Sequence, residues 1–78
     1  MSKLPVLKAR EVVKLLERLG FNKVRQKGSH IFFQHPDGRT TVVPYHPTKQ
    51  IGKGLLKAIL NDIQLSPEEF IKAQRRKN

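Results

Sequence analysis

A short basic segment, Lys27-Gly28-Ser29-His30, combines groups that can bind a phosphate with a group that can move a proton. Its glycine lets the backbone approach a ligand closely, and the free N–H groups of such a turn can hold a phosphate. Lys27 adds positive charge, Ser29 adds a hydroxyl donor, and His30 carries the side chain best suited to proton transfer near neutral pH. These groups would suffice to cleave RNA without a metal, which makes His30 a candidate general acid or base. A β-turn glycine followed by a surface histidine, with no catalytic role, is the alternative.

The other two histidines carry weaker signals. His46 lies between two prolines and is either a second acid or base or a structural residue of the turn. His35 lies at the far end of the strand that begins near His30, about 15 Å away at roughly 3.3 Å per residue, and is expected to be non-catalytic. The chain has three histidines and no cysteine, and their spacing matches no zinc site. Neither a metal nor another cofactor is therefore expected.

Positive charge dominates the composition. Sixteen Lys and Arg residues against six Asp and Glu residues give the 78-residue chain a net charge of +10, which favours a nucleic acid or another acidic partner. Two glycines and two lysines within residues 49–54 are expected at the start of a helix, where unpaired N–H groups suit a phosphate backbone. Their spacing is not that of a P-loop. The residues expected to contact RNA are Lys23, Arg25, Lys27, Gly28, Ser29, Lys49, Lys53 and Lys57.

Patterned segments would position these residues. An apolar stripe with helical spacing predicts a helix over 8–19, and Gly20 suits the end of that helix. Period-two patterning around Pro36-Asp37-Gly38 predicts a β-hairpin in which His30 and Phe32 share one face. The predicted elements are, in chain order, a helix over 8–19, a short edge strand over 22–27, strands over 29–35 and 39–43, a helix over 51–62 and a last short helix. The helix over 51–62 has an apolar stripe of Leu55, Leu56, Ile59, Leu60 and Ile63. The last helix begins at Ser66-Pro67-Glu68-Glu69 and is anchored by Phe70.

This α-β-β-β-α order, followed by a small helix, predicts an α+β fold in one domain of residues 1–78. A three-stranded antiparallel sheet would carry helices on one face and leave the other face open to solvent or a partner. The basic tail at 71–78 is assigned no role. No apolar run approaches the ~20 residues that a membrane span needs, and the N-terminus lacks a signal-peptide pattern. A cytoplasmic protein without a membrane partner is therefore expected.

Several short segments share an order and spacing that are distinctive in a chain of this length: Leu19-Gly20-Phe21, Lys27-Gly28-Ser29-His30, Pro36-Asp37-Gly38-Arg39, Val42-Val43-Pro44-Tyr45-His46, Gly52-Lys53-Gly54-Leu55-Leu56-Lys57-Ala58-Ile59-Leu60 and Leu65-Ser66-Pro67-Glu68-Glu69-Phe70. In this arrangement the chain resembles the HicA (YcfA-like) family of small mRNA interferase toxins. The resemblance covers about residues 4–70 and leaves residues 71–78 outside the family pattern.

The resemblance implies a fold similar to the double-stranded-RNA-binding domain, ribosome-independent cleavage of mRNA, and growth arrest. It implies that His30, in the Gly-Ser-His element, is the functional histidine. It also implies that a HicB-type antitoxin protein neutralises the toxin by covering its active face.

Two points stay open in the residues themselves. The second catalytic group could be Lys27, Ser29 or His46. The alternative function is a non-catalytic RNA-binding module of the double-stranded type, which would use Lys49, Lys53 and Lys57 to follow the RNA backbone. An interaction protein with a basic face is a third possibility, and it is compatible with binding of an antitoxin.

The cations that could stabilise a charged transition state are Lys23, Arg25, Lys27, Lys53 and Lys57.

Overall fold

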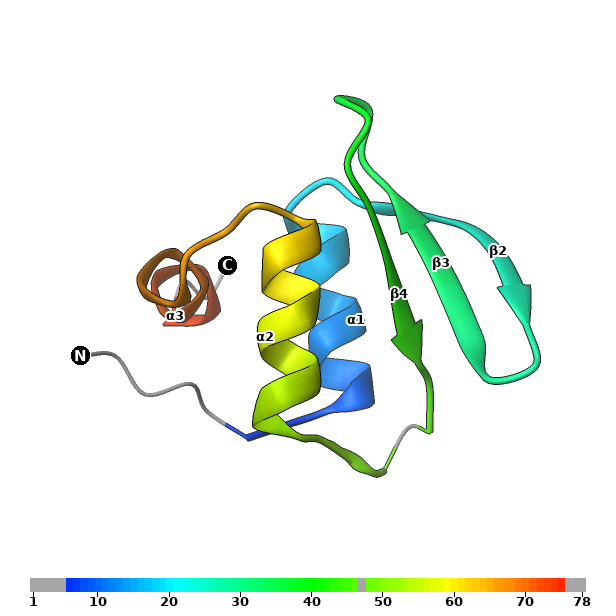
Figure 1. The fold of residues 1–78 in the computed structure, drawn as a ribbon, viewed down its shortest axis with the longest axis horizontal. Coiled ribbons are helices and arrows are strands. Elements are labelled where there is room, and N and C mark those ends of the chain that lie inside the picture. The colour runs from blue at the N-terminus through cyan, green and yellow to red at the C-terminus, as the bar shows by residue number, and fades with distance from the viewer. Residues whose placement is uncertain (1–5, 47, 76–78) are drawn as a thin grey trace.

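Three helices and two antiparallel sheets make up the computed structural model, which describes residues 6–46 and 48–75 (Figure 1). The elements are, in chain order, β1 (Leu7–Lys8), α1 (Ala9–Arg18), β2 (Asn22–Lys27), β3 (His30–Gln34), β4 (Thr40–Pro44), β5 (Gln50–Ile51), α2 (Lys53–Asp62) and α3 (Pro67–Arg75). The larger sheet has the order β2-β3-β4, and β1 pairs with β5. This architecture confirms the predicted α+β fold, with the α-β-β-β-α order of the double-stranded-RNA-binding domain. Residues 76–78 of the predicted tail lie outside the described residues.

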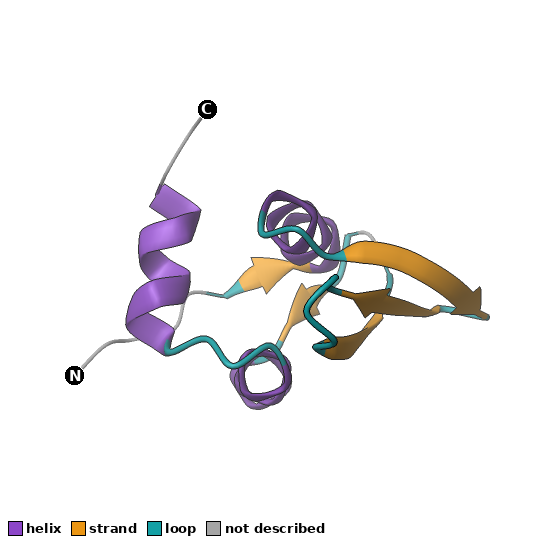
Figure 2. Ribbon diagram, turned by 90° about the horizontal axis from the view of Figure 1, so that it is seen from above, coloured by secondary structure: helices purple, strands orange, loops and turns teal. Residues whose placement is uncertain are grey.

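The helices α1 and α2 lie side by side and both contact β4, while α3 packs against α2 on the side away from the sheet (Figures 1 and 2). Burial alternates along the strands that these helices cover. Ile31 and Phe33 are buried, whereas Phe32 between them is only half-buried. One face of the sheet therefore belongs to the core, and the opposite face, which we call the outer face, is open as predicted.

The end of α1 follows from the backbone freedom of glycine. Gly20 has a φ of +99°, and the N–H of Phe21 donates to the carbonyl oxygen of Leu16 at 2.9 Å. A Cβ atom on Gly20 would lie 2.9 Å from Nε2 of His35, so a larger residue would also displace the His35 ring. The predicted glycine cap is confirmed, and it lets Phe21 fold back into the core at 2% exposure.

The start of α3 is set by a reciprocal pair of hydrogen bonds. The N–H of Ser66 donates to Oε1 of Glu69 at 2.9 Å, and the N–H of Glu69 donates to Oγ of Ser66 at 3.1 Å. These bonds form the predicted capping box, and the bonds from Ser66 hold the pKa of Glu69 below its ordinary value. Phe70, one residue further, is buried and anchors the helix as predicted.

The connection from β4 to α2 differs from the prediction. β4 continues through Pro44, which pairs with His30, because the last residue of a strand need not donate a ladder hydrogen bond. Gln50–Ile51 forms a strand with β1 instead of the first helical turn, so α2 begins at Lys53. Leu55 does not join the buried stripe of α2, since its side chain is 39% exposed.

Candidate functional site

The candidate site begins at the two-residue turn between β2 and β3. Gly28 has a φ of +58°, and a Cβ atom added there would meet nothing within 4 Å. Beside the turn, Lys27 pairs with His30 across the two strands. Paired residues on neighbouring strands project from the same face of a sheet. The structure therefore brings Lys27 and His30 together next to an open turn.

Two rows of paired residues form the centre of the outer face. The register continues across all three strands, and paired positions again share one face. The rows, which we call the outer-face patch, consist of Lys27, His30 and Pro44 and of Arg25, Phe32 and Val42. Within the second row, the guanidinium carbon of Arg25 lies 4.7 Å from the centroid of the Phe32 ring. The patch therefore combines positive charge, an aromatic ring and an exposed imidazole.

His30 is available to a ligand. Its side chain is exposed, and among residues 6–46 and 48–75 its ring has no hydrogen-bond partner. Both ring nitrogens are therefore free to donate to, or accept from, a bound molecule.

His46 lies at the same end of the sheet as the turn. The N–H of Tyr45 donates to the carbonyl oxygen of Ser29, so the next residue, His46, follows directly beyond the last row. The carbonyl oxygen of His46 in turn accepts from the N–H of Lys49 at 2.8 Å. His46 and Lys49 are both exposed. The chain thus carries a second histidine to the neighbourhood of His30 by backbone pairing.

The lysines of α2 form a separate basic group at the same end of the molecule. Figure 1 shows the start of α2 and the β2–β3 turn at the lower end of the fold. Lys53 and Lys57 are exposed and lie one helical turn apart. Because α2 packs on the covered face of the sheet, these lysines and Lys49 do not belong to the outer-face patch. The predicted RNA-contacting residues are therefore divided between two surfaces.

Lys23, another predicted site residue, does not share a face of the sheet with His30. A register irregularity lies between Lys23 and Arg25, and Lys23 pairs with the core residue Phe33. Its position is therefore in register with the covered face. Arg25 and Lys27 keep the outer-face register, so these two cations share a face of the sheet with His30 and Lys23 does not.

His35 occupies a structural environment at the opposite end of the hairpin. Its ring makes an edge contact with Phe21, with the ring centroids 5.0 Å apart. The N–H of Asp37 donates to Nδ1 of His35 at 3.1 Å. These contacts fit the expectation that His35 is non-catalytic.

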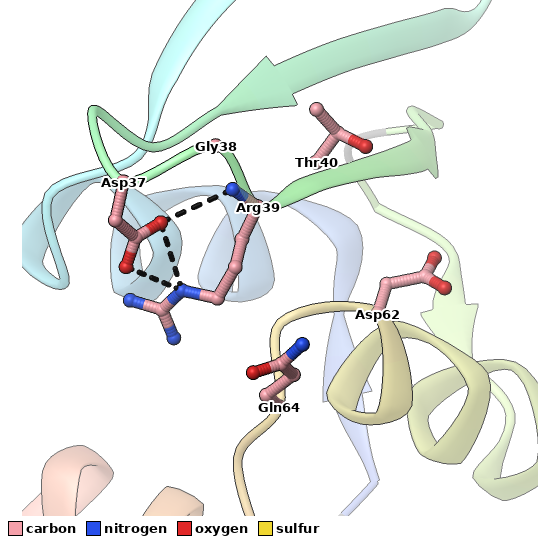
Figure 3. Close-up of a pocket in the computed structure, with 6 residues that line it drawn as sticks. All are labelled: Asp37, Gly38, Arg39, Thr40, Asp62 and Gln64. Carbon is pink, nitrogen blue, oxygen red and sulfur yellow. Dashed lines mark hydrogen bonds and ion pairs between the residues drawn. The ribbon is translucent and has the colours of Figure 1, made fainter.

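An open pocket of about 680 Å³ lies beside the same hairpin turn (Figure 3). Within it, Nε of Arg39 donates to both carboxylate oxygens of Asp37, at 3.1 and 2.8 Å, and Nη1 of Arg39 donates to the carbonyl oxygen of Ile63 at 2.6 Å. Its residues come from the hairpin turn and the end of α2, at the end of the sheet opposite to His30. We assign this pocket a structural role, because its charged side chains already have partners within the protein: Arg39 pairs with Asp37, and Asp62 accepts a hydrogen bond from the hydroxyl of Thr41. It is lined by Asp37, Gly38, Arg39, Thr40, Asp62 and Gln64.

Acid should weaken the hairpin through Asp37. Hydrogen bonds from the side chain and backbone of Arg39 hold the pKa of Asp37 below its ordinary value. The stability that this carboxylate contributes is present above its unfolded pKa, near 4, and is lost as the pH falls through the lower folded value. We expect Asp37→Asn to lower the melting temperature slightly at neutral pH and to reduce its further loss below about pH 4. Thermal melts of both proteins across pH check this. If the melting temperatures of the native protein and Asp37→Asn changed with pH in the same way, the prediction would be contradicted.

The part of the chain that the structure describes contains neither a metal-binding cluster nor a membrane-spanning helix. Within residues 6–46 and 48–75, no group of three or more His, Asp or Glu side chains is placed to hold a metal ion. No helix in that part of the chain is long and apolar enough to cross a membrane.

Most of the chain matches a known protein family. The family described as "HicA toxin of bacterial toxin-antitoxin" matches residues 9–65, a span that runs from the start of α1 to just beyond α2. The chain belongs to the HicA toxin family. It is the toxin component of a toxin–antitoxin system, and such a toxin has an antitoxin as its partner. A search of curated proteins gave no match. In this HicA-family toxin, His30 and the whole three-stranded sheet lie inside the matched span, whereas α3 lies outside it.

Proposed function

We propose that this HicA-family toxin is a metal-independent endoribonuclease that cleaves mRNA, with His30 as the general acid or base. The observation that carries the proposal is the exposed imidazole of His30, on a residue that lies opposite Lys27 in the strand register and beside the open Gly28 turn. The resemblance to the HicA family, whose members are mRNA interferases, supports the same activity.

The residues suggest how the reaction would proceed. His30 would remove the proton of a ribose 2′-OH, and the 2′ oxygen would attack the adjacent phosphorus. The bond from phosphorus to the 5′ oxygen would break as an acid protonates that leaving oxygen, giving a 2′,3′-cyclic phosphate and a 5′-hydroxyl. Lys27 would stabilise the negative charge that develops on the phosphate. His46 is a candidate for the second acid or base, because the hydrogen bond from Tyr45 to Ser29 brings the chain at His46 to the same end of the sheet as His30.

We further propose that the antitoxin is of the HicB type and covers the outer-face patch. An acidic antitoxin surface would complement the net charge of +10. Such a complex would remove His30 from contact with RNA.

Cleavage in the presence of EDTA tests the activity. Purified toxin should cut single-stranded mRNA transcripts with EDTA present, and the 3′ fragments should carry 5′-hydroxyl ends that polynucleotide kinase can label directly. Cleavage that occurs only with a divalent cation would contradict the proposed mechanism.

The alternative of a non-catalytic RNA-binding module rests on the exposed Lys53 and Lys57 at the start of α2. Domains of the double-stranded type contact backbone phosphates and 2′-hydroxyl groups across the minor groove. This alternative would replace the nuclease if the native chain binds duplex RNA tightly and leaves every RNA intact.

The salt dependence of binding should report the phosphate contact of Lys27. We expect Lys27→Gln to reduce the slope of log K against log salt concentration by about 0.7 on single-stranded RNA, because one fewer counterion is released. Binding titrations between low and high salt measure this slope. The matched control is Lys14→Gln, since Lys14 is an exposed lysine of α1. Equal slopes for native toxin and Lys27→Gln would remove Lys27 from the phosphate-binding group.

A further inference from the structure

Phe32 is an aromatic residue that lies outside the hydrophobic core. Its neighbours in β3, Ile31 and Phe33, point into the core and are 5% and 0% exposed. Phe32 lies on the outer face and is only half-buried. A ring on the solvent side of a sheet is well placed to contact a partner.

The surroundings of Phe32 indicate which chemistry that partner has. The guanidinium of Arg25 lies over the ring at 4.7 Å from its centroid, and the row with Lys27 and His30 lies next to it. Unpaired RNA bases stack on aromatic rings and on the planar guanidinium groups of arginine. Positive charge beside such a ring complements the phosphates that flank the base. The patch therefore has the composition of a platform for a single nucleotide.

The spacing within β3 connects this platform to the candidate catalytic residue. His30 and Phe32 are two residues apart on the same face, which places them about 6.6 Å apart along the strand. A base on Phe32 and a phosphate beside His30 can therefore belong to the same or neighbouring nucleotides. Bases inside a duplex cannot offer a free face to such a ring.

We propose that an unpaired base of the substrate stacks on the pair formed by Arg25 and Phe32 and thereby positions the scissile phosphate at His30. This inference rests on the proposed nuclease function and adds that the substrate is single-stranded at the cut site. Phe32 is a positioning residue, because it holds the base and does not contact the reacting atoms.

The absence of tryptophan from the sequence makes this stacking directly observable. Phe32→Trp, made together with His30→Ala so that RNA stays intact, introduces one fluorophore at the platform. We expect a single-stranded oligonucleotide to quench its fluorescence. An abasic oligonucleotide of equal length and a duplex should bind through their charge and leave the fluorescence unchanged. Ile71→Trp in the same background is the control, because Ile71 is a half-buried residue of α3, away from the outer-face patch and from the lysines of α2, and should report no quenching.

The outcomes separate this inference from the proposed function. Binding of the single strand without quenching, or equal quenching by abasic RNA, would overturn the stacking. Quenching with the expected pattern supports base stacking on Phe32, whether or not the native toxin cuts RNA. A native toxin that cuts no RNA would instead contradict the proposed nuclease function.

A second variant tests the role of the ring in cleavage. Phe32→Leu keeps an apolar side chain and should weaken binding of single-stranded RNA on the order of five- to a hundredfold, the range for one lost stacking contact. Phe32→Tyr should restore both binding and cleavage. Thermal melting of each variant verifies the fold, and a folded Phe32→Leu toxin with native binding would overturn the proposal.

Discussion

Replacing His30 with alanine is expected to reduce RNA cleavage by about 10²–10⁴-fold, the contribution of a positioned general acid or base. The same variant should no longer arrest growth when it is expressed without an antitoxin. Its melting temperature should match that of the native toxin, because the side chain is exposed and has no hydrogen-bond partner in the described part of the chain. Cleavage of a labelled single-stranded transcript in EDTA measures the loss.

Two further variants make the result specific to proton transfer. His30→Gln keeps a polar side chain that can form hydrogen bonds but cannot exchange a proton in this pH range, so it should be as inactive as His30→Ala. Gln34→Ala is the matched control, since Gln34 is an exposed residue of the same strand and face but lies outside the outer-face patch. A folded His30→Ala toxin that cuts at the native rate would remove His30 from the mechanism.

The hairpin, the end of α1 and the start of α3 were predictable because their signals are local. The turn at Pro36-Asp37-Gly38 and the glycine at position 20 impose backbone geometry on their immediate neighbours. The capping box of Ser66 and Glu69 spans only four residues. Such features need no information about the rest of the fold, so the sequence alone is enough to locate them.

Features that depend on distant pairing were not predictable in the same way. The strands β1 and β5 have two residues each, and they meet only because the chain folds Leu7 against Ile51. The position of Lys23 depends on the register irregularity next to Arg25. A strict period of two places Lys23, Arg25 and Lys27 on one face, and a bulge reverses this for the residues beyond it.

The candidate site shows the same division. Its catalytic candidate stands in a recognisable local segment, Lys27-Gly28-Ser29-His30. The contact between Arg25 and Phe32 needs the register of two strands, so alternation alone predicts the face of Phe32 but not its partner. The candidate surface can therefore be predicted in part from residue spacing and in part only from the fold.

Arg39→Ala should cause the largest loss of stability among single changes outside the apolar core. The guanidinium of Arg39 donates to the carbonyl oxygen of Ile63, just after α2, and lies 5.2 Å from the ring centroid of the buried Phe21. Loss of a charged hydrogen bond to a part-buried carbonyl, together with the cation–π contact, should lower the free energy of unfolding by about 2–3 kcal/mol. In a domain of this size, the melting temperature should fall by roughly 10–20 °C.

The geometry of Arg39 explains why Asp37, its exposed ion-pair partner, contributes less to stability than Arg39 does. The ion pair with Asp37 is in contact with solvent, where such pairs contribute little, so Asp37→Asn should have a much smaller effect at neutral pH. Arg39→Lys keeps the charge but cannot reach Asp37 and Ile63 together through one planar group, so it should recover only part of the loss. Chemical denaturation of the three variants measures this order. If Asp37→Asn proved as destabilising as Arg39→Ala, the ion pair rather than the bridge from the hairpin to the end of α2 would hold the two elements together.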